Sequence, residues 1–412
     1  MDFDIAIIDE IQQINNEERG SAWTTTLLGL KAKEIHLCGD SSAIDIVQNI
    51  CKTQGDDFEC YQYERMSELK VRKDEYKLNQ DLKEGDCFIC FSINDIFALQ
   101  KKINDISNQK FKTCKINYCS IIYGRQPFEI KIQQADLFNS QQNKFLISTD
   151  AIGMGINLNI KRIVFTNIYK LQQNVMNRLD FSAIQQIAGR AGRYQENGEV
   201  CAFYQDQIRI IQKALNDQSN QNRQQKIKAA IEPSFDQILE TKSLLEQIYP
   251  NRSFNLIDIF QKFAELSCID DIYFYSSCQD MQFRLNLIQK YNLSLEDQYR
   301  FGKCPIRNGK QYELEQNIFQ LYAKQFIQNK QCFLPEIFKD NCKLNEILNF
   351  NSINQDIQET IQLFENFIII YEQYKYLSNI YGNSVFVDLN QVDKQKQIIC
   401  QALLQIYKKN AI

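Results

Sequence analysis

Three groups of polar residues follow apolar segments, at positions where their side chains could do chemistry. The first group is the carboxylate pair Asp9 and Glu10, which ends the apolar run 3–9. In phosphate chemistry one such carboxylate can hold Mg²⁺, and the other can orient or polarise an attacking water molecule. Taken alone, the pair favours an ordinary loop, because Asp-Glu after an apolar run is a common loop sequence.

The second group follows the apolar segment 145–149 and contains Thr149, Asp150, Gly153 and Gly155. Two glycines two residues apart allow the backbone to approach a phosphate or a nucleotide closely. The Thr149 hydroxyl can donate a hydrogen bond, and the Asp150 carboxylate can accept one from a ribose or orient an arginine. A G-x-G alone is a weak signal, but this one follows the strand that such a site requires.

The third group, Gln186, Arg190 and Arg193, ends a segment with helical periodicity. Two arginines three residues apart lie on one helix face. From there they could reach the γ-phosphate of a nucleotide and stabilise the charge that develops during hydrolysis. The alternative is a solvated basic helix end. It does not explain Gly189 and Gly192, each of which costs a helix about 1 kcal/mol, so the pattern favours a functional site.

Short apolar strands alternate with amphipathic helices around these groups. We predict strands at 3–9, 34–38, 87–91, 117–122, 145–149, 162–167 and 199–204, and helices at 24–30, 43–51, 94–106, 129–138 and 182–188. This alternation is typical of an α/β fold in which helices cover both faces of a parallel sheet. Ligands of such sheets bind at the carboxyl ends of the strands, which is where the first two groups stand.

The chain is long enough for more than one domain. Polar and charged residues dominate 52–85, which we interpret as a crossing into a second domain, and 216–228 is the best linker candidate. Beyond this linker the pattern is helical: apolar residues between 256 and 263 share one helix face, and 357–381 is a long helical region. We therefore predict domains at 1–60, 61–215 and 216–412, with an all-α last domain.

Composition limits the classes of protein to which the chain can belong. It has 412 residues, 44% of them hydrophobic, and a net charge of −4. Any contact with nucleic acid must therefore come from a local groove and not from overall charge. No apolar run approaches the ~18–20 residues of a membrane helix. The 14 cysteines lie mostly in apolar runs beside a single histidine, which favours buried thiols over zinc ligands, including for Cys87 and Cys90.

The order of the three groups along the chain resembles motifs II, V and VI of superfamily-two helicases. Flanking segments narrow the resemblance to the mitochondrial degradosome RNA helicase family, whose members are ATP-dependent and work beside an exoribonuclease. The segments similar to this family are Ala6–Gln12, Arg19–Thr24, Leu28–Leu30, Ile35–Gly39, Ala43–Asp45, Gly85–Cys87, Cys90–Ile96, Ile122–Gly124, Thr149–Leu158, Gln186–Arg193, Phe254–Phe260, Asp280–Phe283, Leu293–Leu295 and Pro305–Ile306. The resemblance covers most of the chain and becomes vague after about residue 350.

The resemblance implies two RecA-like domains, with 1–60 as the C-terminal part of the first and 61–215 as the second. A helical C-terminal region would follow at 216–412. It implies ATP and Mg²⁺ as cofactors, RNA as substrate, an exoribonuclease as partner, the mitochondrial matrix as compartment and no membrane. The implied function is ATP-driven unwinding of RNA for mitochondrial RNA decay and surveillance.

The same resemblance assigns a role to each motif residue. Asp9 would hold Mg²⁺, Glu10 would activate water and Gln12 would sense the opposite domain. The residues that would contact the nucleotide are Asp150, Gly153, Gly155, Gln186, Arg190 and Arg193. The residues that would contact RNA are Phe91, Ser92, Tyr123, Gly124 and Thr149.

The chain departs from the family pattern in one large way, because no G-x-x-x-x-G-K-[ST] occurs in it. We expect this phosphate-binding loop upstream of Met1, and we expect the chain alone to be inactive in ATP hydrolysis. One alternative is a complete, non-hydrolysing scaffold that binds RNA. A second alternative is a pure protein-interaction scaffold, which only the helical C-terminal region supports.

Overall fold

The computed structural model describes residues 3–63, 67–111, 116–153, 155–172, 175–192, 197–216, 227–339 and 357–409. The chain divides into two compact units, each assembled from three segments. Unit 1 contains Met1–Gln62, Ser219–Phe333 and Glu372–Leu389. Unit 2 contains Tyr63–Gln218, Leu334–Tyr371 and Asn390–Ile412.

Unit 2 is built on a parallel β-sheet. Within the described residues its six strands follow the order β3-β10-β7-β4-β6-β5, and every neighbouring pair is parallel. The strands are β3 (Leu69–Val71), β4 (Asp86–Ile89), β5 (Cys119–Ile122), β6 (Phe145–Ser148), β7 (Arg162–Phe165) and β10 (Gly198–Ala202). All four residues of β4, β5, β6 and β7 are buried, as expected for strands that are covered on both faces.

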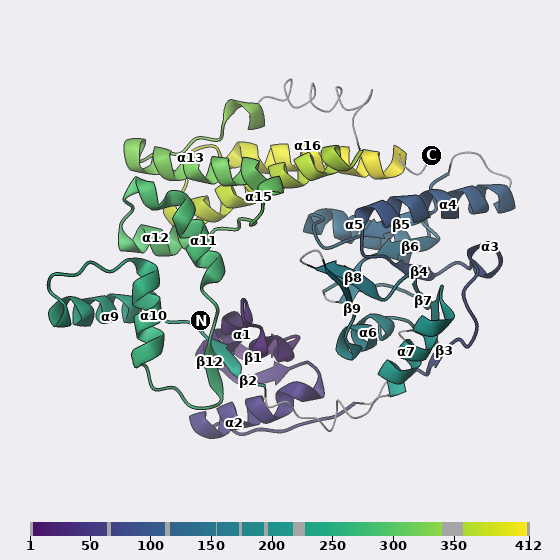
Figure 1. Cartoon of the computed structure of the whole chain (residues 1–412), viewed down its shortest axis with the longest axis horizontal. Coiled ribbons are helices and arrows are strands. Elements are labelled where there is room, and N and C mark those ends of the chain that lie inside the picture. Colours follow the sequence, from purple (N-terminus) through teal and green to yellow (C-terminus); the bar gives the residue numbers. More distant parts are fainter. Residues whose placement is uncertain are drawn as a thin grey trace. The chain divides into compact units, whose positions relative to one another are not determined.

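Helices cover both faces of this sheet. Figure 1 shows α4 (Ile93–Phe111) and α5 (Phe128–Asn139) near the β5 end of the strand order, and α6 (Phe181–Ala188) and α7 (Gln205–Asn216) toward the β3 end. Apolar residues of α6 and α7, such as Ile187 and Ile211, pack against strand residues such as Phe165 in one core. The predicted α/β fold with a parallel sheet is therefore confirmed.

Three further parts of unit 2 lie outside the sheet. An antiparallel hairpin pairs β8 (Tyr169–Gln172) with β9 (Val175–Arg178). Residues from two C-terminal helices, α15 (Ile357–Tyr381) and α16 (Leu389–Lys409), also belong to this unit, whereas 372–381 of α15 belong to unit 1. A short helix, α3 (Leu78–Asp81), precedes β4.

A buried ion pair joins the amino ends of β4 and β7. The Arg162 Nε and Nη2 atoms donate to the two carboxylate oxygens of Asp86, both at 2.8 Å. The Tyr76 hydroxyl donates to the same carboxylate at 2.7 Å. Burial and the nearby Asp86 raise the pKa of Tyr76, so its hydroxyl stays protonated and remains a donor.

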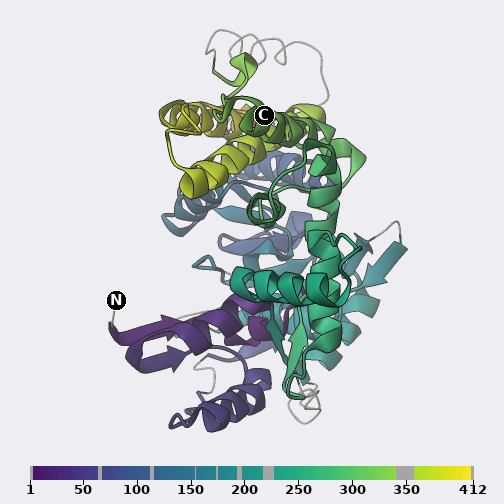
Figure 2. The same ribbon diagram turned by 90° about the vertical axis from the view of Figure 1, so that its left-hand side faces the viewer.

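The N-terminal part of unit 1 is a small parallel pair of strands. Figure 2 shows β1 (Phe3–Ile8) and β2 (Ala32–Leu37) side by side near the marked N-terminus. The helices α1 (Gly20–Gly29) and α2 (Ile44–Gln54) accompany them. The core contains Ile8 from β1, Ile14 and the α2 residues Ile46, Val47 and Ile50.

The remainder of unit 1 is mostly helical. Its helices are α9 (Phe235–Ile248), α10 (Leu256–Leu266), α11 (Gln279–Ile288), α12 (Leu295–Gly302) and α13 (Glu313–Asn329). A short parallel pair, β11 (Ala229–Ile231) with β12 (Tyr273–Tyr275), interrupts the region expected to be all-helical. These strands have three residues each, too few to show a period in the sequence. No described helix is long and apolar enough to cross a membrane.

Candidate nucleotide and RNA site

The motif residues of unit 2 stand at the carboxyl edge of its sheet. Backbone hydrogen bonds connect the strand ends here: the Cys90 N–H donates to Ser148 O at 2.8 Å, and the Thr149 N–H donates to Ile122 O at 3.1 Å. Because β4, β6 and β5 are neighbours in the sheet, these bonds bring three polar loops together. This edge is where ligands of parallel sheets bind.

Ser92 follows β4 and begins α4. Its hydroxyl accepts a hydrogen bond from the Asp95 N–H at 3.0 Å and donates to Asp95 Oδ2 at 2.6 Å. Ser92 therefore caps the helix. Phe91 is half-buried and packs against the core of the sheet. The N-terminus of a helix with free N–H groups attracts anions such as phosphate, so this position is compatible with the predicted contact with RNA.

The turn after β5 exposes Gly124 and Arg125 but buries Tyr123, whose side chain is 2% exposed. A contact between RNA and Tyr123 would therefore involve its backbone and not its ring. Gly124 is open on the side where a Cβ atom would lie, with no atom within 4 Å of that position. The ammonium group of Lys131 donates to Gly124 O at 2.8 Å.

The loop after β6 holds the second group of predicted residues. The Thr149 Oγ1 accepts from the Ala151 N–H at 3.2 Å and so starts the short 3-10 helix Asp150–Gly153. The Asp150 carboxylate accepts from Lys170 Nζ of β8 at 2.6 Å. Gly155 has φ +72°, a conformation that favours glycine. Met154 lies outside the described residues.

The end of α6 contacts this loop directly. Arg190 is 8% exposed and donates to the carbonyl oxygens of Gly153 and Ile156. A Cβ atom on Gly153 would lie 3.4 Å from the Gln186 side chain. The structure thus brings Gln186, Arg190 and the glycine loop together, whereas Arg193 lies outside the described residues. In this arrangement the Arg190 guanidinium holds the backbone of the loop.

In unit 1 the predicted carboxylates follow β1 in a strained turn. Glu10 adopts a left-handed backbone conformation, φ 53° and ψ 46°, which is uncommon for a residue other than glycine. Its N–H donates to Asp9 Oδ1 at 2.9 Å. The indole Nε1 of Trp23 donates to Asp9 O at 3.0 Å. Such strain persists only where surrounding contacts impose it, and it clusters at functional sites.

Gln12 orients the Glu10 carboxylate. Its Nε2 atom donates to Glu10 Oε2 at 2.5 Å, and its Oε1 atom accepts from the Asp40 N–H at 3.3 Å. Gly39 makes this packing possible, because a Cβ atom there would lie 2.5 Å from Gln12 Oε1. Within unit 1, Gln12 therefore connects the end of β1 to the end of β2.

The residues present are compatible with Mg²⁺ but do not form a complete metal site. Mg²⁺ is usually held by one or two carboxylates together with water and phosphate oxygens. The exposed carboxylate of Asp9 fits that role. Among the described residues no group of three or more His, Cys, Asp or Glu side chains could hold a metal by itself.

Several residues at these sites were not found from the sequence. Asp40, Lys170 and Lys131 are ordinary surface types in the sequence, and only the fold brings them to Gln12, Asp150 and Gly124. Trp23 packs against the unit 1 core, and its indole also donates to Asp9 O.

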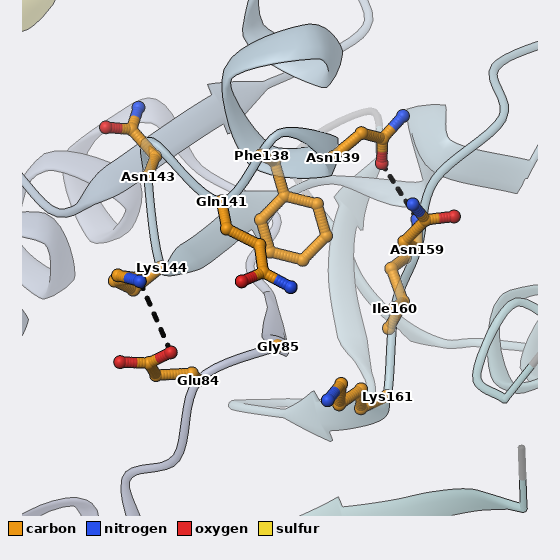
Figure 3. Close-up of a pocket in the computed structure, with 10 residues that line it drawn as sticks. All are labelled: Glu84, Gly85, Phe138, Asn139, Gln141, Asn143, Lys144, Asn159, Ile160 and Lys161. Atoms are coloured by element: carbon orange, nitrogen blue, oxygen red, sulfur yellow. Dashed lines mark hydrogen bonds and ion pairs between the residues drawn. The ribbon is translucent and has the colours of Figure 1, made fainter.

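A pocket of unit 2 lies at the opposite edge of the sheet. It has a volume of about 340 Å³ and is lined by residues such as Gly85, Lys144 and Lys161 beside the amino ends of β4, β6 and β7 (Figure 3). The Lys144 ammonium pairs with Glu84 at 3.4 Å. None of the predicted site residues lines this pocket, so it is not the predicted nucleotide site.

Comparison with known proteins agrees with the geometry. Residues 1–63 match the DEXQ-box helicase domain of Suv3, and residues 58–195 match the helicase conserved C-terminal domain. A solved structure of S. cerevisiae Dbp5 bound to RNA and ADP BeF3 overlaps 54% of this chain and 63% of that chain, with a TM-score of 0.36 and 14% identity.

Three curated relatives are similar over most of this chain. It is 35% identical over 352 residues to the mitochondrial ATP-dependent RNA helicase SUV3 homolog of Drosophila pseudoobscura pseudoobscura, covering 82% of this chain and 43% of the relative. It is 36% identical over 309 residues to the mitochondrial DExH-box helicase DExH16 of Arabidopsis thaliana, covering 74% and 51%. It is 34% identical over 339 residues to mitochondrial SUPV3L1 of Homo sapiens, covering 80% and 40%.

The parallel sheet with a glycine loop and the Gln186–Arg190 helix end at its carboxyl edge defines a RecA-like helicase domain. The chain spans 40–51% of the length of these relatives. It belongs to the SUV3 family of RNA helicases.

Proposed function

We propose that this chain is part of an ATP-dependent RNA helicase that unwinds RNA. The observation that supports this best is the arrangement of unit 2, where loops after β4, β5 and β6 meet at one sheet edge beside the Arg190 helix end. The names of the relatives, all ATP-dependent RNA helicases, agree with the proposal.

The residues of unit 1 would prepare ATP for hydrolysis. Asp9 would hold Mg²⁺, which neutralises charge on the phosphates when it is bound. Glu10 would accept the proton of the attacking water molecule, because its carboxylate is oriented by the Gln12 amide. Gln12 would then transmit a change in Glu10 to Asp40.

The residues of unit 2 would act on nucleotide and RNA. Asp150, Gly153, Gly155 and Gln186 would contact the nucleotide, and Arg193 would stabilise charge on its phosphates. Arg190 would join Arg193 in this role once its guanidinium leaves the carbonyl oxygens of Gly153 and Ile156. The RNA backbone would contact Ser92, Gly124 and Thr149, with Phe91 and Tyr123 supporting these loops. Contacts of this kind go to phosphates, so affinity should fall as salt rises.

The biological setting is proposed from the same relatives. Their names place them in mitochondria, and we propose the mitochondrial matrix as the compartment of this protein. We propose RNA decay and surveillance beside an exoribonuclease as its role. The proposed domains are 1–60, the C-terminal part of a first RecA-like domain; 61–215, a second one; and 216–412, a helical region.

The sharpest test of the proposed chemistry is Glu10→Gln. This variant keeps the volume and the hydrogen bond to Gln12 but removes the base. The test uses the full protein encoded by the complete transcript. Its rate of RNA-stimulated ATP hydrolysis should fall by about 100-fold, and its affinity for RNA should not change. The matched control is Glu18→Gln, an exposed carboxylate eight residues away, which should hydrolyse ATP at the wild-type rate. Equal rates for both variants would contradict the proposal.

A second candidate is an RNA-binding scaffold that does not hydrolyse ATP. It is favoured by one observation: the chain has no G-x-x-x-x-G-K-[ST], since Cys304 follows Gly302–Lys303 and Gln311 follows Gly309–Lys310. Sequencing the transcript across its 5′ end separates the candidates. An upstream in-frame phosphate-binding loop supports the helicase. A stop codon just upstream of Met1, with salt-sensitive RNA binding but no ATP hydrolysis, supports the scaffold.

A further inference from the structure

We infer that Tyr407 of α16 is a positioning residue for the turn 123–126 of unit 2, so that the C-terminal helices set the geometry of an RNA-contacting loop. The inference rests on the proposed contact of this turn with RNA. It gives the helical C-terminal region a function, whereas the helicase motifs assign none to this region.

The central contact is a pair of buried tyrosines. The hydroxyl oxygens of Tyr123 and Tyr407 lie 2.6 Å apart, and each side chain is 2% exposed. Their rings meet edge to face, with centroids 6.4 Å apart. The buried carboxylate of Glu365, on α15, acts electrostatically on the same Tyr123 hydroxyl. Burial, Tyr407 and Glu365 raise the pKa of Tyr123, so its hydroxyl remains a donor.

The backbone of the turn is fixed to the same tyrosine. The Tyr123 N–H donates to Gln126 Oε1 at 3.2 Å, and Gln126 Nε2 donates to Ile121 O at 3.0 Å. Gln126 is buried, whereas Gly124 and Arg125 between the two anchors are exposed. A displacement of the Tyr123 side chain would therefore move the exposed part of the turn.

The C-terminal helix is attached firmly enough to act as the support. Gln100 of α4 donates to Tyr407 O at 3.3 Å and satisfies a carbonyl in the last turn of α16. The ring of Phe97 packs on Tyr407 with centroids 6.1 Å apart. Lys396 of α16, 13% exposed, pairs with Glu129 of α5 at 2.6 Å. These contacts hold α16 against the helices that flank the turn.

The exposed turn carries a cation suited to RNA. Arg125 stands beside Gly124, and Thr149 bonds to the strand end that precedes them. A guanidinium binds phosphate oxygens in a bidentate manner, provided that its backbone is held in place. We assign to Arg125 the contact with an RNA phosphate. We assign to Tyr407 the positioning of the turn that carries Arg125.

The first experiment compares two tyrosine-to-phenylalanine variants of the full protein. Tyr407→Phe keeps the ring but removes the hydroxyl that bonds to Tyr123, and it should weaken binding of single-stranded RNA by about fivefold. The matched control is Tyr371→Phe, a buried tyrosine of α15 whose hydroxyl bonds instead to Phe338 O at 3.4 Å. It should bind RNA like the wild type. Equal affinity for all three proteins overturns the inference.

A double-mutant cycle separates positioning from general destabilisation. Arg125→Gln alone should weaken RNA binding by about fivefold and reduce the slope of log affinity against log salt by about 0.7. In the Tyr407→Phe background, Arg125→Gln should reduce the affinity for RNA by a smaller factor, because the turn is already displaced. Fully additive effects overturn the inference. If wild-type protein does not bind RNA, the proposed function itself fails.

Hydrogen exchange provides a readout that does not depend on RNA. In Tyr407→Phe the amide of Tyr123 should exchange at least several-fold faster than in wild type, while amides of β7 should be unchanged. If Tyr407→Phe does not fold, Glu365→Gln, which alters the same hydroxyl cluster, takes its place in each measurement. Unchanged exchange at Tyr123 in a folded variant contradicts the inference.

Discussion

At the scale of single residues, the turn after β1 depends on contacts that the sequence does not reveal. Asp9 and Glu10 are visible in the sequence because they follow an apolar run. The left-handed conformation of Glu10 and the Trp23 bond to Asp9 are not, since both depend on residues brought together by folding. The motif thus predicts which residues act, whereas the contacts that orient them are visible only in the structure.

Gly39 gives a prediction at this scale. In Gly39→Ala the new Cβ would approach Gln12 Oε1 to 2.5 Å and a methyl group of Ile11 to 2.8 Å. Gln12 must then move away from Glu10, so RNA-stimulated ATP hydrolysis should fall by on the order of tenfold. The control is Gly29→Ala, because no atom lies within 4 Å of its new Cβ. Wild-type turnover by Gly39→Ala would show that Gln12 does not orient the carboxylate.

At the scale of elements, strand prediction succeeded where both faces are buried. The predicted strands 87–91, 117–122, 145–149 and 162–167 overlap β4, β5, β6 and β7, each of which is fully buried and reads as an apolar run. The β8–β9 hairpin was missed, because β9 is exposed along its whole length and has no apolar period. β3 was missed within a polar segment, where three residues leave no pattern.

The ion pair between β4 and β7 predicts a large effect on stability. Arg162→Met leaves the Asp86 carboxylate buried without its cation, because the two side chains are 5% and 2% exposed. The free energy of unfolding should fall by about 3–5 kcal/mol. Lys161→Met, at the exposed neighbouring position, should change it by less than about 0.5 kcal/mol. Urea unfolding measures both, and similar values would refute the structural role of the pair.

At the scale of the whole molecule, the prediction that most cysteines are buried thiols can be tested. Burial raises the pKa of Cys90 to about 12, and of Cys201 to about 12, so both remain protonated thiols near neutral pH. Cys38, Cys60 and Cys268 are exposed. A thiol reagent at about pH 8 should modify these three first, as read by mass spectrometry. If Cys90 in the folded protein is modified as fast as Cys60, the burial of Cys90 is contradicted. As a control, all cysteines should be labelled in urea.

The helical C-terminal region shows the limit of prediction at this scale. Its helical character was correctly predicted, since apolar periodicity over 357–381 matches α15. Which residues of α15 and α16 pack with which unit was not predictable. Long-range contacts such as Tyr123 with Tyr407 join positions 284 residues apart, and a single sequence shows no pattern for such pairs.

The discontinuity of both units has a consequence for synthesis on the ribosome. Unit 1 begins with residues 1–62 and is completed only by 372–389, and unit 2 is completed only by residues after 390. At about 5–20 residues per second, the early strands wait on the order of tens of seconds for their last partners. During that interval the apolar side chains that the completed units bury are a natural target for chaperones, in addition to Phe3, Ile5 and Ile7 of β1, which stay exposed in the completed structure. Nascent chains stalled before residue 372 should therefore be retained by chaperones and degraded.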